Sequence, residues 1–301
     1  MSGRWCRSSA SRAQVPTGAL VATATMLQGA LQYDAARNLL LEARELYRSA
    51  KNVLGEAWGL TFLGRDASYR APGSAEARTL FEAAPSRYRE SDVPAGAGWC
   101  LGFLAFEALI ADDDDLARRR AEEAVQLGRS AHIGQVVGEG LRALAILDSR
   151  AGDFENSDRQ FAELIDIHEA AGDRVQLFLA QADAAEEAAK RGDVARAAPH
   201  LAAGAELARE TQASEQTLII VASAAYVAYM DGRLGDAAML FGARLGSSPL
   251  TSPNRFRFRH ILESLEKQGL HEEIAAGAEL TVDEALERVV ELVSRHPSPP
   301  A

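Results

Sequence analysis

The sequence predicts an all-α protein built from a repeated helix pair, and three observations lead to this prediction. Small, helix-forming residues dominate the 47% hydrophobic share of the 301 residues, whereas aromatic residues supply only 6%. Gly152, Gly192 and Gly232 are separated by 40 residues each, and each ends one helix-like run and begins another. A small residue and then a large one follow each glycine at fixed spacing. Together these features predict an α-solenoid of about six helix pairs.

The repeat extends through most of the chain. A small residue stands five positions after each of the three glycines, and stepping back along the chain by about 40 residues at a time finds a small residue in each earlier unit. The series is Ala36, Ala77, Ala117, Ser157, Ala197 and Ala237. The position four residues further on is mostly large: Leu40, Phe81, Ala121, Phe161, Leu201 and Phe241. Because residues at i and i+4 share one helix face, we expect both series to lie in helix contacts. The first helices carry their own apolar pairs: Leu104-Ala105, Leu144-Ala145, Ala184-Ala185 and Ala224-Ala225.

Turn signals separate the two helices of each unit. In Gly152-Asp153 and Gly192-Asp193, glycine suits a left-handed helix end and aspartate caps the next helix. Pro72-Gly73-Ser74 and the acidic run from Asp112 to Asp115 stand in the same place in earlier units. Ala171-Gly172-Asp173 marks a break between units. The predicted units span residues 17–249.

Two segments fall outside the repeat. Residues 1–16 hold three arginines and no acidic residue, and we expect this segment to be disordered. The apolar run that follows, Gly18 to Leu31, imitates a signal peptide, but the first helix of unit one is expected there. Residues 250–301 are expected to form a C-terminal helical cap, with helices at Asn254 to Gln268 and Thr281 to Arg295, and a flexible tail. Thr281 and Glu284 form a capping-box pattern at the start of the last helix.

These motifs resemble tetratricopeptide (TPR) repeats in a version lengthened to 40 residues. The resemblance implies a right-handed α-solenoid of about six TPR-like helix pairs. The end of the chain, with Ala237 to Ala243 and then Ala275 to Ala285, looks like the C-terminal part of bacterial LuxR-type and related STAND ATPase regulators. Such regulators carry a nucleotide-binding domain before the repeats, and often finish with a Leu-Phe-Gly-Ala stretch and a small-residue segment.

Several departures limit what the resemblance implies. The chain contains no Gly-Lys pair, so a phosphate-binding P-loop is missing and no ATP or other cofactor is expected. We find no basic helix-turn-helix, and the net charge of −11 disfavours nucleic-acid binding. The longest apolar stretch, Thr217 to Met230, is too short to span a membrane. The prediction is a cytoplasmic, non-enzymatic interaction or sensor module, the detached regulatory portion of a transcriptional regulator, with a protein or peptide partner.

No pattern in the sequence predicts a metal or catalytic site. The six histidines never stand at i, i+3 or i+4, the spacing of a helical zinc site. Asp112 to Asp115 lacks the glycine and closing glutamate of a calcium loop, which favours helix capping. Cys100 could meet only His132 or His168 in a solenoid, and a buried structural cysteine is the favoured interpretation.

A basic cluster near the end of the repeat has two interpretations. Arg255, Arg257, Arg259 and His260 alternate with Phe256 and Phe258, which superficially resembles a nucleic-acid strip. In a helix, however, the two phenylalanines diverge by about 200° and cannot form one platform. An amphipathic cap helix is therefore favoured.

The predicted binding surface is the concave groove that first helices line in TPR-like stacks. Candidate exposed residues on these helices are Trp58, Trp99, Arg142 and Gln181. Tryptophan and arginine are the residues that most often anchor interfaces. Trp58 and Trp99 could equally belong to the core between units. A small-molecule receptor or an enzyme with its site in the groove is the alternative function.

Overall fold

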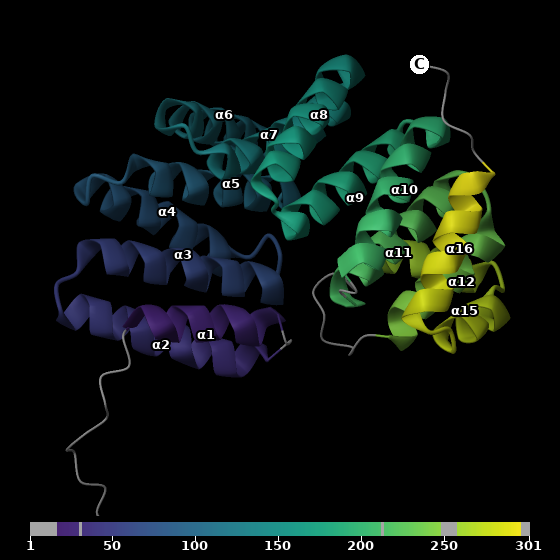
Figure 1. Cartoon of the computed structure of the whole chain (residues 1–301), viewed down its shortest axis with the longest axis horizontal. Helices are drawn as coiled ribbons and strands as arrows, with labels where there is room; N and C mark the ends of the chain where they lie inside the picture. Colours follow the sequence, from purple (N-terminus) through teal and green to yellow (C-terminus); the bar gives the residue numbers. More distant parts are fainter. Residues whose placement is uncertain (1–16, 30–31, 212–213, 248–257, 296–301) are drawn as a thin grey trace, which may run out of the picture.

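The computed structural model describes residues 17–29, 32–211, 214–247 and 258–295, and within these ranges every regular element is an α-helix (Figure 1). The first twelve helices form consecutive pairs along the chain. Their bounds are α1 Thr17–Gly29, α2 Tyr33–Ser49, α3 Val53–Arg70, α4 Ala75–Glu90, α5 Pro94–Ile110, α6 Asp114–Ala131, α7 Gly134–Ala151, α8 Phe154–Ala171, α9 Arg174–Lys190, α10 Val194–Thr211, α11 Ser214–Met230 and α12 Leu234–Gly246. Three more helices follow: α14 Arg259–Lys267, α15 His271–Ala278 and α16 Val282–Ser294.

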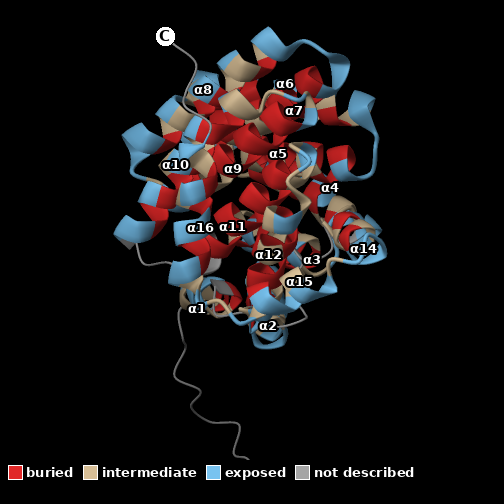
Figure 2. Ribbon diagram, turned by 90° about the vertical axis from the view of Figure 1, so that its right-hand side faces the viewer, coloured by how far each residue is buried: buried red, intermediate tan, exposed pale blue. Residues whose placement is uncertain are grey.

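The helices pack mainly against their neighbours in sequence, so the fold is a curved stack from α1 and α2 to α15 and α16 (Figure 1). First helices of adjacent units also touch, most extensively α5 with α7 and α9 with α11. Buried residues line the inner sides of these helices, while the outer sides are exposed (Figure 2). This arrangement confirms the predicted all-α stack of helix pairs.

The two residue series that define the repeat are buried in every unit. All six small residues, from Ala36 to Ala237, are at most 1% exposed, and all six residues of the second series, from Leu40 to Phe241, are at most 4% exposed. The apolar pairs of the first helices, such as Leu104-Ala105 and Ala224-Ala225, are buried too. Both series therefore mark the faces along which helices pack.

The helix ends follow the predicted turn chemistry. Gly152 and Gly192 each have a φ of +82°, a left-handed conformation that glycine adopts without strain. The Asp153 carboxylate accepts a hydrogen bond from the Asn156 amide at 3.2 Å and so caps α8. Asp113 caps α6 in the same way, which confirms the capping interpretation of the acidic run. These local signals mark the start of α6 and the turns that separate α7 from α8 and α9 from α10.

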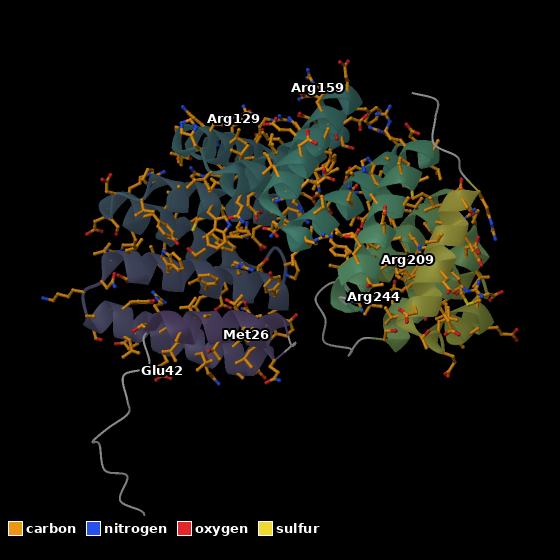
Figure 3. All side chains as sticks on the ribbon, viewed as in Figure 1. Met26, Glu42, Arg129, Arg159, Arg209 and Arg244 are labelled. Atoms are coloured by element: carbon orange, nitrogen blue, oxygen red, sulfur yellow. The ribbon has the colours of Figure 1, made fainter. Side chains whose placement is uncertain are left out.

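Ion pairs join successive units on the surface. Arg70, at the end of α3, contacts Asp34 at the start of α2 at 2.9 Å, and Arg150 of α7 contacts Asp114 of α6 at 2.8 Å. On the outer helices, Arg129 projects from the stack and pairs with Glu163 (Figure 3). Exposed pairs of this kind add about 0–1 kcal/mol each. Each of these pairs joins helices of adjacent units and depends on the register in which those units pack.

The C-terminal helices cover the end of the stack. Thr281 and Glu284 form the predicted capping box at the start of α16, which packs on α10 and α11. Helix α14 lies within the predicted helix from Asn254 to Gln268, whose first residues are outside the described ranges. Helix α15 was not predicted, and it packs closely on α12. The expectations for residues 1–16 and for the tail after 295 also lie outside the described residues.

Candidate functional site

The candidate site is a group of aromatic and charged side chains on the first helices α3, α5 and α7. One face of α5 presents Trp99, Phe103 and Phe106, because residues at i, i+4 and i+7 lie on the same side of a helix. Helices α3 and α7 flank this face. We call the group the α5 cluster. Its members are Trp58, Phe62, Arg65, Tyr69, Trp99, Phe103, Phe106, Glu139 and Arg142.

Ring contacts connect α3 to α5. The Phe62 ring lies 5.9 Å from the Trp99 ring in an edge-on arrangement, and the Trp99 and Phe103 rings are 5.3 Å apart. Trp58 packs 6.0 Å from Phe62. Trp58 and Tyr69 remain 45% and 39% exposed, so the cluster is anchored in the core and opens to solvent. Aromatic contacts of this kind stabilise the arrangement of the rings as well as burying them.

Arg65 lies among these rings. Its guanidinium carbon is 5.5–5.8 Å from the ring centroids of Phe62, Tyr69, Trp99 and Phe103. Cation–π interactions at such distances contribute about 0.5–2 kcal/mol each, depending on exposure. The rings therefore hold Arg65 in place.

Helix α7 reaches the other side of the α5 face. The guanidinium of Arg142 lies 4.3 Å from the centre of the Phe106 ring and forms an ion pair with Asp183 of α9. A Cβ at Gly102 would come within 2.5 Å of the Glu139 Cβ, so the absence of a side chain at Gly102 admits Glu139. Burial raises the pKa of Glu139, while Arg142 and Arg65 oppose this shift.

The four candidates predicted from the sequence have different positions. Trp58 is an exposed member of the α5 cluster, and Trp99 is a half-buried member. Arg142 belongs to the cluster, but its side chain is only 15% exposed because it pairs with Asp183. Gln181 is 6% exposed and its Oε1 lies 2.8 Å from Nδ1 of His200. The expectation of an exposed side chain is thus wrong for Gln181, because α9 turns that face into the stack.

Sequence reasoning missed six members of the cluster: Phe62, Arg65, Tyr69, Phe103, Phe106 and Glu139. A helical stripe search could have found the aromatic members, since Phe62 and Tyr69 are seven residues apart, as are Trp99 and Phe106. No sequence signal indicates that Glu139 meets the same surface, because that contact depends on the packing of α7 against α5.

The other groups considered from the sequence have structural roles. Cys100 is fully buried, its Sγ lies 3.0 Å from the Thr61 hydroxyl, and burial raises the pKa of its thiol to about 12. The prediction that Cys100 is buried is thus confirmed, and a thiol with a raised pKa is a weak nucleophile at neutral pH. Phe258 packs 5.6 Å from the rings of Tyr226 and Phe241, while Arg255, Phe256 and Arg257 lie outside the described residues.

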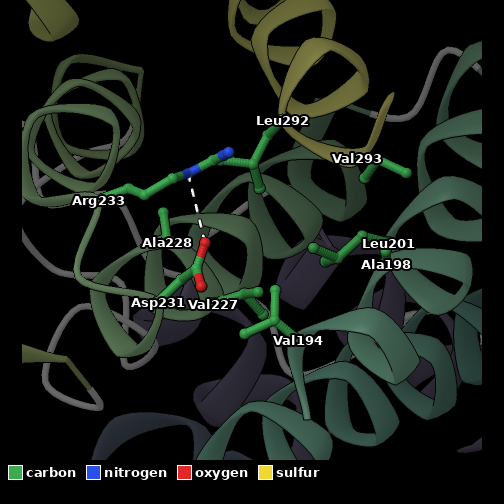
Figure 4. A pocket seen from close by; sticks show the side chains of 9 residues that line it. All are labelled: Val194, Ala198, Leu201, Val227, Ala228, Asp231, Arg233, Leu292 and Val293. Atoms are coloured by element: carbon green, nitrogen blue, oxygen red, sulfur yellow. Dashed lines mark ion pairs between the residues drawn. The ribbon is translucent and has the colours of Figure 1, made fainter. Parts of the chain in front are cut away.

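A small pocket lies between the last units and the cap (Figure 4). Its cavity volume is about 10 Å³, and its walls are aliphatic side chains of α10, α11 and α16. Asp231 and Arg233 border it and pair with each other at 3.7 Å. The pocket therefore offers an apolar seam with one ion pair, in contrast to the varied chemistry of the α5 cluster.

None of the described helices combines the length and apolar character that crossing a bilayer requires. No protein-family model matches the chain, and no curated protein matches it at a significant level.

Proposed function

We propose that the chain is a non-enzymatic protein-interaction module that binds a protein or peptide partner through the α5 cluster. The observation that carries this proposal is the concentration of partly exposed aromatic side chains on adjacent first helices. Aromatic residues are only 6% of the sequence, yet Trp58, Tyr69, Trp99, Phe103 and Phe106 gather on one surface. Tryptophan, tyrosine and arginine dominate the binding energy of protein interfaces.

The rigidity of the cluster supports the same proposal. Phe62 is 8% exposed and packs against both Trp58 and Trp99, and Arg65 is held between rings of two helices. A surface whose anchors are already ordered loses less side-chain entropy when a partner binds. We therefore place the recognition surface on α3, α5 and α7, and leave Gln181 out of it.

The proposal extends to the finer architecture and context. We propose a right-handed, TPR-like stack, and its 40-residue period is supported by the left-handed helix ends that recur at Gly152, Gly192 and Gly232. The likeness of the chain's end to LuxR-type and STAND regulators supports a role as the sensor or interaction portion of a bacterial transcriptional regulator, acting in the cytoplasm. The likeness rests on two segments, one around Gly242 and one around Gly277. Both glycines lie where α12 and α15 pack closely, so the two segments share one helix contact.

Site-specific photocrosslinking tests the location of the binding surface. The photoreactive residue p-benzoylphenylalanine replaces Tyr69 in one variant and Arg159, which projects from the outer face of α8, in a control (Figure 3). After irradiation in native lysate, we expect a defined partner band at position 69 only. Crosslinks of equal yield at both positions, or none at position 69, would contradict the proposal.

A further inference from the structure

The α5 cluster contains a guanidinium whose hydrogen-bonding capacity is mostly unused. Arg65 donates one hydrogen bond from Nη2 to the Tyr69 hydroxyl at 3.1 Å. Within the described ranges no carboxylate lies within ion-pair distance of Arg65, and its other side-chain nitrogens reach solvent. Arginine has five N–H donors in a rigid fork that matches a carboxylate. Arg65 is therefore ordered by rings and open to an anionic group.

Other arginines on the inner helices and their neighbours differ from Arg65. Arg142 pairs with Asp183, and Arg118 contacts Asp148 at 2.7 Å. In both pairs the carboxylate belongs to the fold and is nearly buried. Pairing inside the fold satisfies these guanidinium groups, whereas Arg65 has aromatic neighbours, one hydroxyl and only an electrostatic interaction with Glu139 that is no ion pair.

Glu139 is the complementary case on α7. Its side chain is half-buried, and among the described residues its carboxylate forms no hydrogen bond or ion pair. Arg65 and Arg142 influence it electrostatically without closing an ion pair, and Arg142 is already engaged with Asp183. Holding a half-buried carboxylate without a partner costs free energy, and such costs are typical of functional sites.

We propose that Arg65 and Glu139 together recognise a partner segment that carries one acidic and one basic side chain. This inference rests on the proposed function and adds the chemistry of the partner. Arg65 binds the carboxylate of the segment through its open N–H donors. Glu139 binds the ammonium or guanidinium group, and the rings of Trp99 and Phe103 contact the apolar stems between the two charges. Each charge of the site then gains a direct ion pair, which Arg65 and Glu139 do not form with each other or with another described residue.

A random decapeptide phage library is the probe that tests this proposal. The library is selected on the purified chain and, in parallel, on a variant with Trp58→Ala and Tyr69→Ala, which removes exposed rings of the cluster. We expect peptides that bind the unaltered chain only, and that share an acidic and a basic residue beside apolar ones. Isothermal titration then measures the affinity of one selected peptide and of its Asp→Asn or Lys→Gln relatives.

Two variants assign the charges. Arg65→Met keeps the volume of the side chain, and Glu139→Gln keeps its shape; each is expected to weaken the peptide about tenfold. On the Arg65→Met variant, replacing the acidic residue of the peptide should not lower the affinity further. On the Glu139→Gln variant, replacing the basic residue of the peptide should not lower it further. The controls are Arg44→Met, half-buried on α2, and Glu206→Gln, exposed on α10; both are expected to leave affinity unchanged.

The outcomes separate this inference from the proposed function. Peptides that need Trp58 and Tyr69 but show no charge preference overturn the inference and leave the proposed function intact. Failure to select any peptide that needs these two rings overturns both. If Arg65→Met does not fold by circular dichroism, the Glu139→Gln titration and the sequences selected on the unaltered chain still decide the question.

Discussion

Gly277 of α15 lies against the carbonyl oxygen of Met239 in α12, so close that a Cβ at position 277 would come within 2.0 Å of that oxygen. The two helices are equally close at Gly242 of α12, where a Cβ would come within 2.1 Å of the carbonyl oxygen of Ile274 in α15. Gly277→Ala should therefore force the two helices apart and lower the free energy of unfolding by about 1–3 kcal/mol. Urea denaturation measures the change. Gly235→Ala, where a Cβ meets nothing within 4 Å, is the control; equal losses in both variants would show that the crossing is not tight.

The small-residue series can be tested at Ala197, which is 0% exposed in α10. Ala197→Leu adds three carbon atoms to a packed contact between helices, and overpacking of this kind costs about 1–3 kcal/mol. Ala202→Leu, at an exposed position of the same helix, should change stability by less than about 0.5 kcal/mol. Thermal melts of both variants provide the comparison. A neutral Ala197→Leu would mean that the repeat register is assigned wrongly.

Arg142 connects the α5 cluster to α9 and is expected to be structurally important. The sequence predicted an exposed groove residue, and replacing an exposed side chain changes stability by no more than about 0.5 kcal/mol. The ion pair with Asp183, whose side chain is 1% exposed, reverses that expectation. Arg142→Ala takes a counter-charge from a buried carboxylate and should cost about 3 kcal/mol. The double variant with Asp183→Asn should recover part of the loss; no recovery in urea titrations would contradict a role for the ion pair.

Glu139 predicts a particular pH dependence of stability. Burial raises the pKa of Glu139, so the folded state holds this proton more tightly than the unfolded state. Stability contributed by the protonated carboxyl is present at pH values below its unfolded pKa and is lost as the pH rises through the folded pKa. Glu139→Gln should therefore stabilise the chain at pH 7, and the gain should shrink toward pH 4. Melting temperatures across this range test the sign, and a destabilised variant at pH 7 would refute it.

The repeat could be predicted from the sequence because each unit carries similar residue types at the same spacing. Ala117 and Phe161 are buried for the reason that their spacing indicates, and Asp153 caps α8 as its place after Gly152 predicts. Helix α15 was missed because its eight residues are too short and too rich in alanine and glycine to show a periodic apolar face. Its contact with α12 depends on backbone proximity, which no hydrophobic pattern records.

The binding surface was harder to predict than the fold. Trp58 and Trp99 stood out by residue type, and both belong to the α5 cluster. Gln181 does not belong to the cluster, because the rotation of α9 about its axis decides which of its residues face the stack. Neither Arg65 nor Glu139 could be recognised from the sequence, because what distinguishes them in three dimensions is that the fold gives neither a direct ion pair. Which side chains of α3, α5 and α7 come together depends on how the units pack, and the sequence of a single unit does not show it.

The return of α16 onto α10 and α11 has a consequence for self-association. Stacks of helix repeats expose apolar surface at each end, and identical chains can join there head to tail into filaments. Val289 and Leu292 of α16 are at most 5% exposed, buried with Leu286 against the preceding units. Helix α16 thus covers apolar surface of α10 and α11 that a second copy of the chain would otherwise find exposed for head-to-tail contact.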